Sequence, residues 1–85
     1  MKPRLEFILL KLLEVLHSMP DGQCAEGVLK ASVDLLIRPN SLVTEFQEAL
    51  DVAEKNGWIL GVRPTFGAVK WTLTDTGLAE FLKAK

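Results

Sequence analysis

Residues 57–77 read GWILGVRPTFGAVKWTLTDTG, and this stretch decides the fold that the sequence predicts. Two short runs rich in Trp, Val, Ile and Thr, at 58–60 and 69–73, flank the Pro- and Gly-containing segment 63–67. Runs of this composition, joined by a short loop with Pro and Gly, are typical of a β-hairpin. We therefore predict two paired strands between residues 58 and 73.

Helical patterns of apolar residues lie on both sides of the predicted hairpin. Their spacing predicts four helices, at about 3–18, 25–37, 40–56 and 75–84. Pro3 suits the first turn of the first helix, and Gly57 ends the third. The candidate capping residues of the third helix are Asn40 with Ser41 or, slightly later, Thr44 with Gln47.

The apolar residues of the middle two helices predict which sides face the core. The second helix is expected to face inward with Val28, Leu29, Ser32, Val33, Leu35 and Leu36. The third is expected to do so with Leu42, Phe46, Ala49, Leu50 and Ala53. Residues 19–22, Met-Pro-Asp-Gly, form a turn before the second helix.

Length and composition indicate one small domain that spans residues 1–85. Of the 85 residues, 48% are apolar, which is enough for a packed core and excludes disorder as the default. No apolar run reaches the roughly 20 residues needed to cross a bilayer. The largely apolar segment 5–16 lacks a signal-peptide cleavage site. The single cysteine, Cys24, fits a reducing cytoplasm. We expect an α+β, mostly helical, cytoplasmic domain without a membrane partner.

The order helix, helix, helix, hairpin, helix resembles the winged-helix superfamily of bacterial regulators. Residues 54–59, EKNGWI, and 70–82, KWTLTDTGLAEFL, are similar to the segments that those proteins place around their wing. There an L-T-x-x-G phrase closes the hairpin and opens a dimerising helix. The resemblance implies a three-helix bundle with a hairpin wing and a short last helix, and it implies a small DNA-associated transcriptional regulator.

Two features depart from that family's pattern. The joint between helices two and three, residues 38–41, contains proline and no glycine. The third helix carries four carboxylates on its outward side, those of Glu45, Glu48, Asp51 and Glu54, against the single ammonium of Lys55. The chain has a net charge of −1, whereas DNA-binding domains tend to be basic.

The resemblance implies which residues would contact double-stranded DNA. Arg63, Thr65 and Lys70 in the hairpin would hold phosphates, and Ser41, Thr44 and Gln47 near the start of helix three would read bases. The alternative is a protein-interaction module that binds a basic partner through the acidic face of helix three, or uses the Phe7 and Leu10 stripe. Both alternatives stay open at this point.

Two apolar stripes lie on the first and last helices. Phe7 and Leu10 fall among polar residues of the first helix, and Leu78, Phe81 and Leu82 share a face of the last. These stripes either pack together within one chain or meet across a two-fold axis. We expect the second arrangement, a homodimer, because symmetric dimers are the most frequent soluble oligomers.

The sequence contains no pattern of a catalytic, metal or cofactor site. One histidine, His17, and one cysteine, Cys24, do not supply the roughly four ligands of a zinc site. Gly57, Gly61 and Gly67 punctuate the hairpin and do not precede a helix as a phosphate-binding loop would. We therefore expect no cofactor, no metal and no enzymatic activity.

Overall fold

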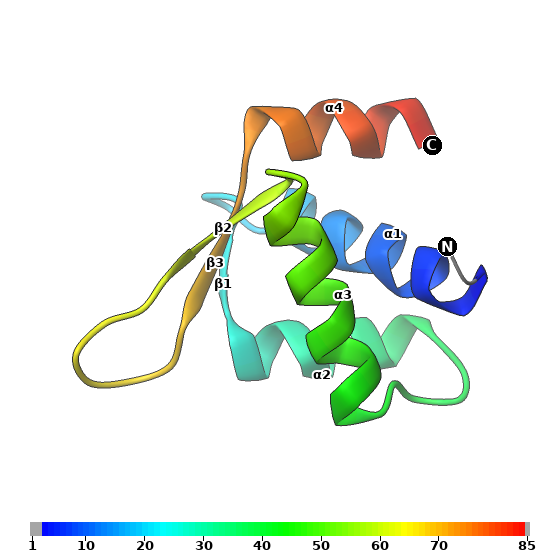
Figure 1. Cartoon of the computed structure of the whole chain (residues 1–85), viewed down its shortest axis with the longest axis horizontal. Helices are drawn as coiled ribbons and strands as arrows, with labels where there is room; N and C mark the ends of the chain where they lie inside the picture. Colours follow the sequence, from blue (N-terminus) through cyan, green and yellow to red (C-terminus); the bar gives the residue numbers. More distant parts are fainter. Residues whose placement is uncertain (1–2, 85) are drawn as a thin grey trace.

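The structure, a computed structural model, describes residues 3–84, and in that range it is an α+β fold in which helix predominates (Figure 1). Its elements, in chain order, are α1 (Pro3–Ser18), β1 (Gln23–Ala25), α2 (Glu26–Leu36), α3 (Val43–Lys55), β2 (Ile59–Val62), β3 (Lys70–Leu73) and α4 (Asp75–Ala84). The α+β, mostly helical class predicted from the sequence is confirmed.

The helices agree with the predicted pattern, with differences at the ends of the middle two. α1 and α4 have the bounds that their periodicity predicted, whereas α2 and α3 are shorter than expected. The predicted caps of α3 are wrong, because its N-cap residue is Leu42. The Leu42 backbone N–H donates to the Glu45 carboxylate at 2.8 Å, so a side chain of the first turn satisfies the helix end instead.

The β2–β3 hairpin is confirmed, and a third strand was not predicted. β2 and β3 pair antiparallel with Ile59 opposite Leu73, and the loop 63–69 connects them. β1 pairs antiparallel with the other edge of β3, which gives the sheet order β1-β3-β2. After the turn at residues 19–22, the chain therefore forms the edge strand β1 before α2 begins. The sequence pattern had predicted that the helix would follow this turn directly.

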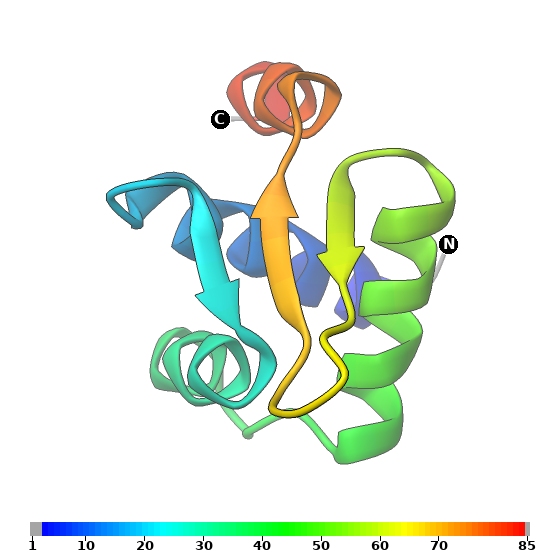
Figure 2. The same ribbon diagram turned by 90° about the vertical axis from the view of Figure 1, so that its left-hand side faces the viewer.

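The sheet is covered on one face and open on the other. Figure 2 looks onto the open face, with α1 passing behind the sheet, α3 beside β2 and α4 beyond one end of the strands. The core lies between the inner face of the sheet and the helices. Its side chains that are at most 1% exposed include Ile8, Leu12, Leu16, Leu29, Val33, Ile37, Phe46 and Leu50.

The predicted inward face of α2 is largely wrong. Leu29 and Val33 are buried, but Leu35 is 77% exposed, Val28 is 56% exposed, and Leu36 also faces solvent. α2 contacts α1 and β1, and these contacts leave the side chains of Val28, Leu35 and Leu36 exposed. Leu42, expected inside, is exposed too, because α3 begins only after it.

A network of short contacts fixes the start of α4 against the entry of the hairpin. The Thr74 hydroxyl donates to the carbonyl oxygens of Gly57 and Trp58, at 2.6 and 2.9 Å, and accepts from the N–H of Gly77 at 3.0 Å. Gly77 lies so close that a Cβ there would overlap the Trp58 carbonyl oxygen. The L-T-x-x-G phrase thus allows α4 to pack directly on backbone.

Candidate interaction surfaces

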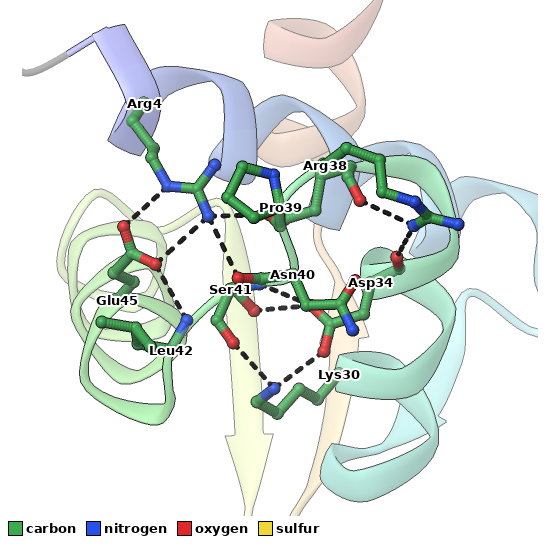
Figure 3. Close-up of polar contacts among 10 residues, drawn as sticks. Arg4, Lys30, Asp34, Arg38, Pro39, Asn40, Ser41, Leu42 and Glu45 are labelled. Atoms are coloured by element: carbon green, nitrogen blue, oxygen red, sulfur yellow. Dashed lines mark hydrogen bonds and ion pairs between the residues drawn. The ribbon is translucent and has the colours of Figure 1, made fainter.

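A hydrogen-bonded clamp holds the turn between α2 and α3, and it contains Ser41 (Figure 3). Asp34 Oδ1 accepts from the Ser41 hydroxyl at 2.7 Å and from the Ser41 N–H at 3.0 Å. Lys30 Nζ donates to Asp34 Oδ2 at 2.8 Å and to the Ser41 carbonyl oxygen at 3.1 Å. Ser41 is only 5% exposed. Its side chain therefore shapes the turn and does not lie on the surface where a base would be read.

The Asp34 carboxylate is stabilised in its charged form by this clamp. Partial burial opposes ionisation, but the hydrogen bonds from Lys30 and Ser41 outweigh it and lower the pKa of Asp34 from its ordinary value of 3.8. The negative charge of Asp34 is therefore paired inside the domain.

A second clamp joins α1 to the start of α3. Arg4 Nε donates to Glu45 Oε2 at 2.7 Å, and the same guanidinium donates to the carbonyl oxygens of Pro39 and Asn40, at 2.9 and 3.2 Å (Figure 3). The hydrogen bonds from Arg4 and from the Leu42 N–H lower the pKa of Glu45. Both charges of this pair are used to connect elements of the same chain.

The outer face of α3 consists of Thr44, Glu48, Asp51 and Lys55, which share one side at helical spacing and are exposed. Among the residues that the structure describes, neither Glu48 nor Asp51 has an ion-pair partner. Two carboxylates therefore face solvent here with one lysine.

The remaining predicted side chains of α3 lie on its flanks. Gln47, a predicted base reader, is exposed, and its Nε2 donates to Glu26 at the start of α2 at 3.2 Å. Glu54 is paired with Arg63 of the β2–β3 loop, and Glu45 is held in the clamp with Arg4. The acidic side predicted for this helix is thus about half neutralised within the domain.

The β2–β3 loop and its flanking strand carry the other three predicted DNA contacts, and Lys70 lies opposite Val62, the residue before Arg63. Arg63 lies at the base of the loop, 3.4 Å from the Glu54 carboxylate and 5.6 Å from the centre of the Trp71 ring. Thr65 is exposed within the loop, and Lys70 is exposed at the start of β3. Phe66 in the same loop is 89% exposed, so it does not fold back onto a neighbouring ring.

The open face of the sheet carries apolar side chains that the sequence did not single out. Ile59 is buried and Gly61 lies against Trp71, so Leu60 and Val62 point to the open side. Residues 59–62 alternate between the buried and the open face, as in any strand. The sequence does not reveal which of them face outward, because all four are apolar or glycine.

The stripes predicted for a dimer are partly used within the chain. α4 packs on α1, and Phe81 is buried there with its ring 5.2 Å from that of His17. Leu10 and Leu78 are half-buried. Phe7 and Leu82 are exposed, so these two side chains remain available to a second copy.

Residues 3–84 contain no group of three or more His, Cys, Asp and Glu side chains that could hold a metal ion. None of the helices in the same range has both the length and the apolar character that a bilayer crossing requires. Comparisons with protein-family models, with curated proteins and with solved structures found no match to this chain.

Proposed function

We propose that this chain is a non-enzymatic winged-helix domain that binds another protein, and that the outer face of α3 contacts a basic partner. The winged-helix assignment is supported by the order of the elements, in which three helices precede a hairpin and a short last helix follows. The strand β1 between α1 and α2 completes the sheet that supports the hairpin. Because a scaffold alone does not define function, the choice of partner is argued from the surface.

The distribution of unpaired charges favours a basic protein partner over DNA. Arg4 is held by Glu45, and Arg63 lies beside Glu54, so neither guanidinium is an unopposed phosphate ligand. Glu48 and Asp51 on the outer face of α3 are unpaired. DNA binding requires free cations along the contact, whereas free carboxylates attract a basic protein surface.

Exposed apolar side chains at the start of α3 support the same proposal. Leu42 is 65% exposed and Val43 is similarly open. Protein interfaces combine such apolar anchors with a polar rim, and the anchors supply most of the binding energy. Leu42 and Val43 would provide the apolar contact, and Glu48 and Asp51 the charged one.

A peptide titration tests this surface. A fluorescein-labelled amphipathic helical peptide, with Leu on one face at helical spacing and Lys on the other, is titrated with the protein at low salt, and anisotropy gives the Kd. We expect the double variant Glu48→Lys, Asp51→Lys to raise the Kd about tenfold or more, because two attractions become repulsions. The control is Glu14→Lys with Asp21→Lys, which changes the net charge equally at residues outside α3. An equal loss of affinity in both double variants would contradict the proposal.

A DNA-associated regulator is the second candidate. It is favoured by the winged-helix scaffold and by the exposure of Thr44, Thr65 and Lys70 on α3 and the wing. The carboxylates of Glu48 and Asp51, on the same face of α3 as Thr44, oppose DNA binding. A reducing cytoplasm is the compartment that we propose for either role, since Cys24 is a free, buried thiol.

A further inference from the structure

A groove of about 390 Å³ lies between α1 and α4, and none of its lining residues belongs to α3. Its lining consists of Glu6, Leu9, Leu10, Leu13, Trp58, Glu80 and Ala84. Four of these side chains are large and apolar, and the charged ones are both carboxylates. Pockets that bind small molecules have this size and this combination of an apolar lining with a few polar groups.

The indole in the groove belongs to a residue whose backbone is fixed on both sides. The Trp58 N–H donates to the Ala53 carbonyl oxygen at 2.9 Å, and the Trp58 carbonyl oxygen accepts from the N–H and the hydroxyl of Thr74, at 3.1 and 2.9 Å. The ring is half-buried and packs against the core. The groove therefore presents an aromatic side chain from a rigid position.

The two carboxylates give the groove a definite charge preference. Glu6 comes from α1 and Glu80 from α4, and within residues 3–84 neither makes an ion pair. An organic cation near an indole gains a cation–π attraction in addition to its attraction to a carboxylate. The apolar side chains of Leu9, Leu10 and Leu13 favour a carbon body attached to that cation.

We propose that this groove is a binding site for a lipophilic organic cation, whose ammonium group is attracted by the carboxylates of Glu6 and Glu80 and whose apolar body packs on Trp58 and the three leucines. Both halves of such a ligand are matched, whereas a neutral apolar molecule leaves the carboxylates unused and an anion is repelled. This site is independent of the α3 surface proposed above, and either proposal can fail without the other.

Three ligands of one shape test the charge preference. The probes are 4-phenylbutylamine, 4-phenylbutan-1-ol and 4-phenylbutyrate at neutral pH, followed by tryptophan fluorescence. We expect saturable binding of the amine, about fivefold weaker binding of the alcohol, and none of the acid. Trp58→Phe should abolish the fluorescence change, because Trp71 is buried away from the groove.

Variants in which an amide replaces a carboxylate then test which residues cause the preference for the amine over the alcohol. Glu6→Gln with Glu80→Gln should remove the difference between amine and alcohol, whereas Glu14→Gln with Asp21→Asn, two changes outside the groove lining, should leave it unchanged. Equal affinity for amine and alcohol in the unaltered protein would overturn the proposal, as would persistence of the preference in the double variant. Absence of saturable binding would overturn it too, including the case in which light scattering shows a constant dimer whose second copy fills the groove.

Discussion

Among the glycines of residues 3–84, Gly77 approaches neighbouring backbone most closely. A Cβ on Gly77 would overlap the Trp58 carbonyl oxygen, which is backbone and also accepts two hydrogen bonds from Thr74. We expect Gly77→Ala to lower the free energy of unfolding by about 1–3 kcal/mol, because α4 must move away from the hairpin. Urea denaturation measures the change.

Gly27 provides a matched control for that substitution. It also lies in a helix, but a Cβ there meets nothing within 4 Å. Gly27→Ala should raise the free energy of unfolding by roughly 0.5–1 kcal/mol, since alanine loses less backbone freedom in a helix. If both alanine variants changed stability alike, the close approach at Gly77 would not be a constraint.

Asp34 makes the stability of the α2–α3 turn dependent on pH. Its folded pKa lies below the ordinary value of 3.8, so its stabilising contribution is complete above that value and is lost as the pH falls through the folded pKa. We expect Asp34→Asn to reduce the loss of stability on acidification below about pH 4. Thermal denaturation from neutral to acidic pH measures this.

The comparison variant for Asp34 is Ser41→Ala. It removes one donor at 2.7 Å but leaves the Ser41 N–H and Lys30 in place. Its cost should be about 1 kcal/mol near neutral pH, and the acid-dependent loss should persist. An unchanged acid profile in Asp34→Asn would show that the clamp is not ionised as described.

The N-terminus of α3 is not optimally capped. Leu42 occupies the N-cap position with extended backbone, and its side chain makes no cap hydrogen bond. Leu42→Ser creates a capping box with Glu45, whose carboxylate already accepts the N–H of residue 42. We expect a gain of about 1 kcal/mol in the free energy of unfolding.

Leu35→Ser is the control for this substitution, because Leu35 is also an exposed leucine but lies at the C-terminal end of α2. Serine there should give no gain, since a serine side chain caps the N-terminus of a helix and not its C-terminus. A similar gain in both variants would attribute the effect to reduced surface hydrophobicity instead of to capping. Chemical denaturation of the two variants side by side distinguishes these causes.

The elements also show what the sequence could and could not predict. α1, α4 and the hairpin follow from strong local patterns, and their positions agree with those patterns. β1 has only three residues, Gln23–Ala25, and its partner β3 is distant in the chain, so no local signal revealed it. Val28 and Leu35 were assigned to the inward face of α2 because they are apolar, but periodicity does not tell whether another element covers that part of a helix.

The candidate surfaces were less predictable than the elements, because they depend on pairs that are distant in sequence. Arg4 meets Glu45 and Arg63 meets Glu54 only in the folded chain, and these contacts change which charges are free. Ser41 was expected at the surface, but its hydrogen bonds to Asp34 bury it. The groove around Trp58 depends on the packing of α1 and α4 and had no signature of its own.

For the whole molecule, the homodimer remains a prediction with Phe7 and Leu82 as its exposed residues. Two side chains cover little of the roughly 1,000 Å² that a stable interface buries, so we expect association that depends on concentration. Light scattering should show the mass rising above the 9.4 kDa of one chain as concentration increases. Phe7→Glu should stay folded and monomeric, and Leu35→Glu should associate as before. A constant monomer mass at high concentration would refute the dimer.

The choice between a protein partner and DNA is tested most directly by titrating a labelled duplex of random sequence with this domain. The measurement is anisotropy at about 50 mM and again at about 200 mM salt, because phosphate contacts make DNA binding strongly salt-dependent. We predict no saturable binding of the duplex at either salt concentration, since Arg4 and Arg63 are paired and Glu48 and Asp51 face outward. Saturable binding at the lower salt that weakens by orders of magnitude at the higher one would contradict the account and identify a DNA-binding domain.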